Sequence, residues 1–153
     1  MRKKILVVVY NLERAREHEW FATTMDLSKY EIHFALVRKP ASQLAVFLES
    51  HGIRVHRFAY DGKKSIPGLT YRLYRLIKLE QYDIVHTHLF ETSLCGMMAA
   101  WAARVPGRIV TRHHSDYHHV NSRLAVWCDR LVSRLSTSVV AISENVKRIL
   151  VEW

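Results

Sequence analysis

The sequence predicts an α/β protein with an open, parallel, Rossmann-like sheet that carries helices on both faces. Short apolar runs rich in Val and Ile alternate with helical stretches about six times, within a chain of 153 residues that suits one domain. The run Leu6–Val9 is apolar throughout, which is typical of a strand covered on both faces. We expect the strand order 3-2-1-4-5-6, with a flavodoxin-like order as the alternative.

Six apolar segments are the expected strands. In chain order they are Ile5–Tyr10, Ile32–Val37, Ile53–Phe58, Asp83–His88, Arg108–Arg112 and Ser138–Ile142. If these strands form the centre of one sheet, part of their side chains fills its interior. The residues expected to be buried there are Leu6, Val8, Val85, Ile109 and Val140.

Five helical segments complete the alternation. They are expected at Ala41–His51, Leu69–Leu79, Thr92–Arg104, Arg123–Leu135 and from Ser143 to Trp153. Gly52 is a natural stop for the first of them, and Val105-Pro106-Gly107 ends the third. The segment Ser143-Glu144-Asn145 is typical of an N-cap with a carboxylate in the first turn, so it opens the last helix. The chain stops in or just after that helix, which we interpret as a fragment boundary.

Composition and charge limit the class of protein. The formal net charge of +9 favours an acidic partner, which is a nucleic acid, an anionic membrane or a phosphorylated substrate. No helix-turn-helix, RNP or zinc-finger signature accompanies the charge, so nucleic acid is not an expected partner. No run approaches the ~20 apolar residues of a membrane helix. Cys95 and Cys128 lie in helical patterns and indicate free thiols, so we expect a cytoplasmic protein, with the inner membrane face as a second location.

Polar residues gather where the expected strands end. In an open parallel sheet, ligands bind beyond the carboxyl ends of the strands. The residues at those ends are Tyr10, Asn11, His86, His88, Arg112, His113, His114 and Ser143. We expect them to line one solvent-open rim.

Other chemistries are disfavoured by motif. His86 and His88 share a strand face, which would suit zinc, but the further Asp and His of a metallo-hydrolase signature are missing. Walker A, G-x-G-x-x-G and G-x-S-x-G patterns are also absent from the sequence. We therefore expect neither a metal nor a cofactor.

Three motifs resemble a known family. Tyr82–His88 resembles the D-[IV]-[IV]-H-x-H strand of group 1 (family 4) retaining glycosyltransferases of the GT-B architecture. Arg108–Asp116 is similar to their next strand, which ends in T-x-H, and Ser138–Lys147 is similar to their [IV]-[IV]-A-[IV]-S-E-x-[IV]-[KR] segment. Together, in the family's order, these motifs indicate the first half of a GT-B fold.

The resemblance implies roles for single residues. In that family the first domain binds the acceptor, and the second holds the nucleotide sugar. His113 then corresponds to a catalytic histidine that approaches the donor's sugar and phosphates, and Ser143 is donor-proximal. His88, Asn11 and Arg112 are expected to contact the acceptor. Many relatives carry a glycine pair where Tyr10-Asn11 stands here, so either this loop takes another path or acceptor and donor are arranged differently.

The resemblance also implies partners. Residues 1–153 are expected to form a single N-terminal, acceptor-side domain that lacks the nucleotide-sugar domain and is inactive alone. The expected partners are a nucleotide-diphosphate sugar, held mainly by the missing domain, and a glycan, lipid-linked or small-molecule acceptor. Arg72, Arg75 and Lys78, with Lys63 and Lys64 before them, suit peripheral membrane contact, and the alternative is a helix packed on the sheet with a solvated basic edge. The alternative is a free-standing, flavodoxin-like binding module whose basic surface meets an anionic partner.

Overall fold

The sheet has the predicted topology. The computed structural model describes residues 2–10, 15–38, 41–113 and 123–152. Within these residues, six parallel strands lie in the order β3-β2-β1-β4-β5-β6. The strands are β1 (Lys3–Tyr10), β2 (Tyr30–Arg38), β3 (Arg54–Ala59), β4 (Ile84–His88), β5 (Gly107–Arg112) and β6 (Ser138–Ala141). The Rossmann-like order is therefore confirmed, and the flavodoxin-like alternative is wrong.

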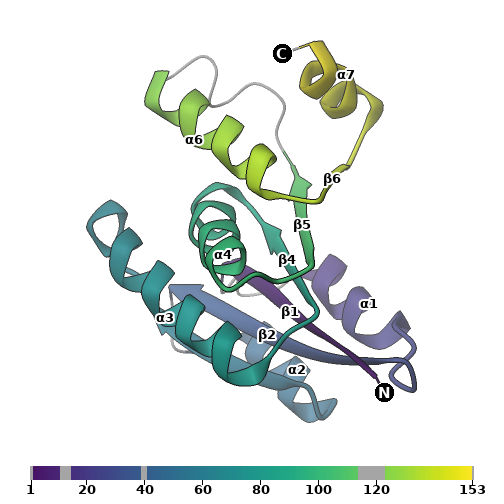
Figure 1. The fold of residues 1–153 in the computed structure, drawn as a ribbon. Helices are drawn as coiled ribbons and strands as arrows, with labels where there is room; N and C mark the ends of the chain where they lie inside the picture. The colour runs from purple at the N-terminus through teal and green to yellow at the C-terminus, as the bar shows by residue number, and fades with distance from the viewer. Residues whose placement is uncertain (1, 11–14, 39–40, 114–122, 153) are drawn as a thin grey trace.

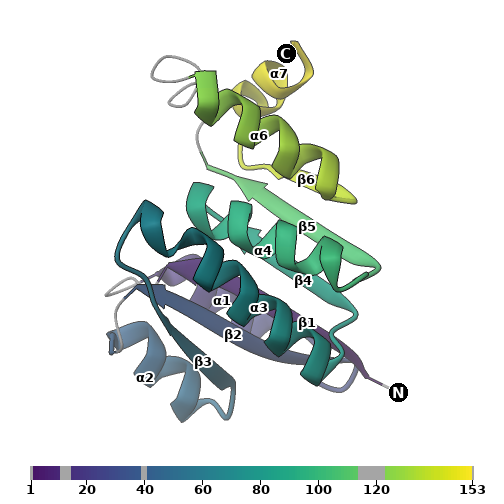
Figure 2. The ribbon, with the colours of Figure 1, turned by 60° about the vertical axis from the view of Figure 1, so that its left-hand side comes forward.

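Helices cover both faces of this sheet. They are α1 (Arg16–Thr24), α2 (Gln43–Ser50), α3 (Ile66–Glu80), α4 (Phe90–Ala102), α6 (Arg123–Leu135) and α7 (Glu144–Glu152), with a short 3-10 turn at Lys63–Ser65. Figure 1 shows α1 and α2 on one face and α3, α4 and α6 on the other, and the turned view in Figure 2 agrees. Each crossover thus returns to the start of the next parallel strand.

The core has two layers because successive side chains of a strand alternate between faces. On β1, Leu6 and Val8 pack under α3 and α4, whereas Val7 and Val9 pack under α1 and α2. Val85 is fully buried as well. The predicted burial of Leu6, Val8 and Val85 is therefore confirmed.

The prediction was wrong at the far edge of the sheet. Val140 is 45% exposed, and Ile109 is only half-buried. The reason is position, since β6 is an edge strand and pairs with β5 on one side only. An apolar run in the sequence does not distinguish an edge strand from an inner one.

The helix α1 was not predicted. It follows β1 and places His18 and Ala22 in the protein interior. The helix α3 also begins earlier than expected, at Ile66, because Pro67 fits the first turn, where its missing N–H costs no hydrogen bond. The predicted N-cap of α7 is confirmed, since Ser143 Oγ accepts a hydrogen bond from Val146 N at 3.2 Å.

A glycine brings α4 against the sheet. A Cβ atom on Gly96 would lie 2.6 Å from Thr87 Cγ2 and 3.7 Å from Val8, so only glycine allows this approach without displacement. The chain turns from β4 into α4 through Leu89, whose φ of 66° is rare for a side-chain-bearing residue. The Thr92 hydroxyl donates a hydrogen bond to His88 O and closes this turn. The end of β4 is thereby held firmly.

Candidate functional site at the carboxyl ends of β4 and β5

Four histidines meet at the carboxyl ends of β4 and β5, and we call His18, His86, His88 and His113 the histidine cluster. The ring centroid of His88 lies 4.3 Å from that of His86, 4.7 Å from that of His18 and 5.5 Å from that of His113. His88 Nδ1 and His113 Nε2 are hydrogen-bonded at 3.2 Å. The cluster therefore joins an unpredicted helix, α1, to the two predicted strand ends.

Strand register explains why the cluster forms. His88 pairs with Thr111 across the β4–β5 ladder, so His113 lies two residues further along, on the same face of the sheet. His86 Nε2 is hydrogen-bonded to Thr111 Oγ1 at 2.8 Å and is fixed in orientation by it. The D-I-V-H-T-H and T-R-H patterns thus place their histidines side by side, as predicted from topology.

Three histidines of the cluster, His18, His86 and His88, are neutral at pH 7. Burial, with a smaller effect from the neighbouring imidazoles, lowers the pKa of His86 to about 4 and that of His88 to about 2. Burial also lowers the pKa of His18, although the charge of Glu17 opposes the shift. Neutral imidazoles offer one N–H donor and one acceptor nitrogen each, which suits hydroxyl and phosphate ligands. Among the residues that the structure describes, no three His, Cys, Asp or Glu side chains are placed to hold a metal ion.

Exposure differs from the expected open rim. His88 is only 9% exposed because α1 packs His18 against it, whereas His113 is half-buried. Ser143 is exposed at the start of α7, beyond the neighbouring strand β6. Asn11 lies outside the described residues. The accessible part of the predicted site is therefore near His113 and Ser143.

Arg112 does not join the other predicted residues. Its guanidinium is buried against α6, where Nη1 forms an ion pair with the Asp129 carboxylate. Nη2 donates to Asp129 O at 3.1 Å and to Ser133 Oγ at 3.0 Å. Because Arg112 alternates with Thr111 and His113 along the chain, it faces the opposite side of the sheet. The expected contact of Arg112 with an acceptor is corrected to a structural contact with α6.

His18 was missed by the sequence analysis, although a signal was present. His18, Phe21, Ala22 and Met25 follow the i, i+3, i+4, i+7 spacing of an amphipathic helix. Charged neighbours and the lack of a side-chain N-cap at Ala15 weakened that signal.

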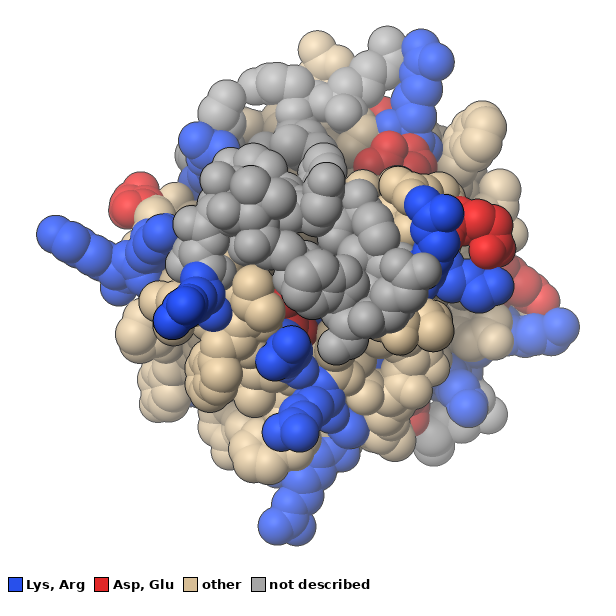
Figure 3. Space-filling model, turned by 90° about the horizontal axis from the view of Figure 1, so that it is seen from above, with Lys and Arg blue, Asp and Glu red and all other residues tan. Residues whose placement is uncertain are grey.

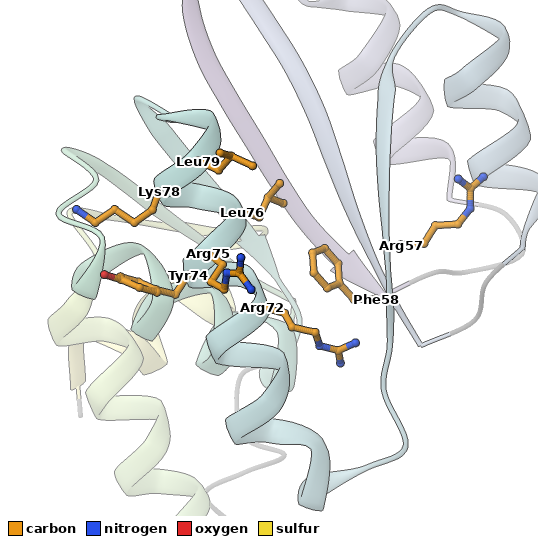
Figure 4. A pocket seen from close by; sticks show the side chains of 8 residues that line it. All are labelled: Arg57, Phe58, Arg72, Tyr74, Arg75, Leu76, Lys78 and Leu79. Atoms are coloured by element: carbon orange, nitrogen blue, oxygen red, sulfur yellow. The ribbon is translucent and has the colours of Figure 1, made fainter.

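Among the described residues, several hollows lie outside the cluster, and two of them are large enough for a small molecule. One, of about 450 Å³, lies at the carboxyl ends of β1 to β3 and is lined by Tyr10, Arg38, Tyr60, Asp61, Gly62 and Glu91. The other, of about 650 Å³, lies between α3 and β3 (Figure 4) and is lined by Arg57, Phe58, Arg72, Tyr74, Arg75, Leu76, Lys78 and Leu79. Elsewhere the basic residues are spread out, as Figure 3 shows for one side of the molecule.

Solved structures with the same fold include proteins bound to UDP or to UDP-GlcNAc. The MnaA–UDP co-structure from S. aureus superposes with a TM-score of 0.75 at 18% identity, over 98% of this chain and 42% of its own. MurG from Acinetobacter baumannii gives 0.69 at 13% identity, over 94% and 42%. UDP-GlcNAc 2-epimerase from Neisseria meningitidis, bound to UDP-GlcNAc, gives 0.71 at 17% identity, over 97% and 43%. These likenesses define the class by fold: one Rossmann-like half of a GT-B protein.

Sequence comparison then gives the family. Residues 22–153 match the model of Glycosyltransferase Family 4, and the chain belongs to that family. Over 84 residues it is 30% identical to the UDP-Gal:alpha-D-GlcNAc-diphosphoundecaprenol alpha-1,3-galactosyltransferase of Escherichia coli. The aligned stretch is 52% of this chain and 22% of that enzyme. The chain therefore spans well under half of the relatives it matches.

Proposed function

We propose that this chain is the acceptor-binding half of a retaining glycosyltransferase, which moves a sugar from a nucleotide-diphosphate sugar to a glycan, lipid-linked or small-molecule acceptor. The observation that carries the proposal is the paired His88 and His113 at the end of the sheet where ligands bind, in a chain of Glycosyltransferase Family 4. Fold alone does not separate transferases from epimerases, because an epimerase shares the fold of this glycosyltransferase chain. Family membership favours transfer.

His113 is the proposed catalytic residue. Charge develops on the departing diphosphate as the sugar leaves, and a prepositioned N–H donor stabilises that charge more in the transition state than in the ground state. The hydrogen bond between His88 and His113 fixes the ring of His113, so we propose His88 as its positioning residue as well as an acceptor contact. Ser143, exposed at the N-terminus of α7, is the proposed donor-proximal residue, since helix N-termini attract phosphate. Asn11 remains a proposed acceptor contact.

A lipid-linked acceptor is the acceptor class we favour. The E. coli relative is named for a sugar carried on diphosphoundecaprenol, and 30% identity over half of this chain supports a related acceptor. The donor that we infer from the same relative is a UDP-hexose. Such an acceptor requires the enzyme to work at a membrane surface.

The outer face of α3 suits peripheral membrane contact. Tyr71, Arg75, Lys78 and Leu79 follow i, i+4, i+7, i+8 spacing and form one exposed stripe of cations and apolar groups. Within the described residues, Arg75 and Lys78 have no acidic partner, whereas Arg57 of the same groove turns to Glu49 at 2.7 Å. No helix of the described part of the chain is long and apolar enough to cross a membrane. We therefore propose attachment from one side only.

The decisive experiment is substitution of His113 in the complete protein. We expect His113→Ala to lower kcat by about 10²–10³-fold with a UDP-hexose donor and a lipid-linked sugar acceptor. His51→Ala, an exposed histidine at the end of α2, is the matched control and should leave kcat unchanged. A folded His113→Ala enzyme with near-normal kcat at saturating substrates would refute the role of His113. No transfer by the unmodified complete protein to any sugar acceptor would refute the function.

A further inference from the structure

The hollow at the carboxyl ends of β1 to β3 is a built pocket that the histidine cluster does not use. Tyr10 extends from the same face of β1 as Leu6 and Val8, so it lies on the α3–α4 side of the sheet. The histidine cluster lies on the α1 side. The two sites therefore share one end of the sheet but occupy opposite faces of it. We call Tyr10, Arg38, Tyr60, Asp61 and Glu91 the tyrosine pocket.

Aromatic rings and oxygens converge in this pocket. The ring centroids of Tyr10 and Tyr60 are 6.1 Å apart, and the ring planes are tilted by 53°. Burial, then the charge of Glu91, raises the pKa of the Tyr10 hydroxyl well above its ordinary value, with a smaller effect from Tyr60. The two hydroxyls and the carboxylate are therefore neighbours. Two rings tilted in this way present two differently oriented apolar surfaces and do not form a parallel slot for a flat base.

One hydroxyl of the pocket lacks a regular hydrogen bond. Tyr60 is 7% exposed, and within the described ranges its buried Oη makes no hydrogen bond of regular geometry, although the Tyr10 hydroxyl lies near enough to interact with it. Burying an unpaired hydroxyl costs stability, and the great majority of buried polar groups in proteins are paired. Arg38 adds a second unfavourable feature, since its φ is 102°. Both residues line the pocket, where a ligand could offer the Tyr60 hydroxyl a partner.

The charges of the pocket select the class of ligand. Asp61 and Glu91 only accept hydrogen bonds, and they repel phosphate, whereas Arg38 only donates. The two carboxylates, the guanidinium and the aromatic rings are all satisfied by one kind of ligand. Such a ligand donates hydrogen bonds from several hydroxyls, accepts one from a cation and presents a C–H face to an aromatic ring. A sugar ring has these properties. The volume of about 450 Å³ lies within the range of small-molecule sites.

We propose that the tyrosine pocket binds the uncharged sugar ring of the acceptor, with sugar hydroxyls donating to Asp61 and Glu91 and a ring face packed on Tyr10. This inference rests on the proposed transferase function and names the part of the acceptor that this chain reads. Recognition through hydroxyls is selective, because a sugar lacking the hydroxyl that meets Glu91 leaves that half-buried carboxylate without its donor. The diphosphate of a lipid-linked acceptor then lies outside the pocket.

The test is binding by the 153-residue chain without any donor. Amide NMR titration with methyl glycosides of glucose, galactose and N-acetylglucosamine should shift residues 60–62 and Glu91. Glu91→Gln should weaken binding about tenfold, because the lost partner is charged. Tyr60→Phe should weaken binding while leaving the melting temperature equal or higher, since it removes an unpaired hydroxyl. Glu49→Gln, on the opposite face, is the matched control and should bind as the unmodified chain does.

Three outcomes would overturn the inference. They are no shift with any neutral glycoside, unchanged affinity in both pocket variants, and preferential binding of glucose 1-phosphate or of a diamine, which would make the pocket an ion site. Failure of the pocket is distinguishable from failure of the function. If Tyr60→Phe leaves the acceptor KM of the complete enzyme unchanged while His113→Ala abolishes turnover, the transferase stands and the pocket does not.

Discussion

His88 Nδ1 lies 3.2 Å from His113 Nε2, across the ends of two adjacent parallel strands. One ring must donate its N–H and the other must accept, so the bond requires at least one neutral imidazole. Burial of His88, together with the neighbouring rings, keeps that residue neutral. Protonation of the cluster would replace this hydrogen bond by repulsion between like charges. The geometry of His113 therefore depends on pH through its neighbours.

Acidification should destabilise the fold through His86 and His88. Their folded pKa values, about 4 and about 2, lie below the unfolded value, so the unfolded chain takes up protons first. The contribution of the two neutral histidines to the free energy of unfolding is fully present above about pH 6.5. It falls as the pH drops toward 4, by at most ~1.4 kcal/mol per pH unit for each histidine. Urea unfolding at a series of pH values measures this slope.

The matched variant for this prediction is His86→Gln, which retains a group able to bond to Thr111 Oγ1. This variant should reduce the slope of the free energy of unfolding against pH between pH 6.5 and 4. It should change the free energy of unfolding at pH 7.5 less than it changes that slope. An unchanged slope in this variant would show that other groups cause the acid sensitivity.

Removal of Asp129 should destabilise the protein strongly. Its carboxylate pairs with the buried guanidinium of Arg112, and loss of one partner leaves an uncompensated buried charge. We expect Asp129→Ala to lower the free energy of unfolding by about 3–5 kcal/mol. Replacing both partners by apolar residues, as in Arg112→Met with Asp129→Leu, should recover most of that loss. A cost below about 1 kcal/mol for Asp129→Ala would contradict a buried, structural pair.

The strands and their order were predictable because they depend on strong signals. Fully apolar runs identify strands that are covered on both faces of the sheet. Right-handed crossovers then leave few possible strand orders. The apolar run around Val140 does not reveal its partial exposure, but the expected strand order does, because that order places the sixth strand at the edge of the sheet. The meeting of His88 and His113 followed from topology alone. The orientation of Arg112 follows from strand alternation, which places it on the face opposite to Thr111 and His113.

The remainder of the site depends on tertiary contacts that a sequence does not display. His18 comes from a helix with a mixed, charged pattern, and its contact with His88 reflects how α1 docks on the sheet. The pairing of Tyr10 with Tyr60 joins residues from β1 and the end of β3, which are separated in the sheet by β2. Neither residue type at its position signals such a contact.

Gly96→Ala should disturb the packing of α4 although alanine favours helices. The new Cβ atom would lie 2.6 Å from Thr87 Cγ2, and that methyl group belongs to a buried, β-branched side chain with little freedom to move. We expect a loss of about 1–3 kcal/mol in the free energy of unfolding, typical of overpacking. Gly68→Ala in α3 has open space around its Cβ position and is the control, with no loss expected. Equal thermal melting of the two variants would contradict the close packing.

The stripe on α3 should hold the chain on anionic vesicles. Each cation near such a surface contributes about 1 kcal/mol, and exposed Tyr71 and Leu79 can insert at the interface beside Arg75 and Lys78. Co-sedimentation with phosphatidylglycerol-containing vesicles should be strong at low salt and weak at high salt. Neutral phosphatidylcholine vesicles should leave the chain in the supernatant. Salt-insensitive recovery in the supernatant with both vesicle types would refute the contact.

Charge reversal separates a specific stripe from the general attraction of a chain with net charge +9. Arg75→Glu with Lys78→Glu should reduce vesicle binding by at least about tenfold, because two attractions of about 1 kcal/mol become repulsions. Arg130→Glu with Arg134→Glu changes the net charge equally from exposed positions on α6. If the stripe on α3 is the membrane contact, only the double variant in α3 should show the full loss of vesicle binding. Equal loss in both pairs would mean that net charge alone draws the chain to the membrane, and that the tyrosine and leucine of α3 serve no docking role.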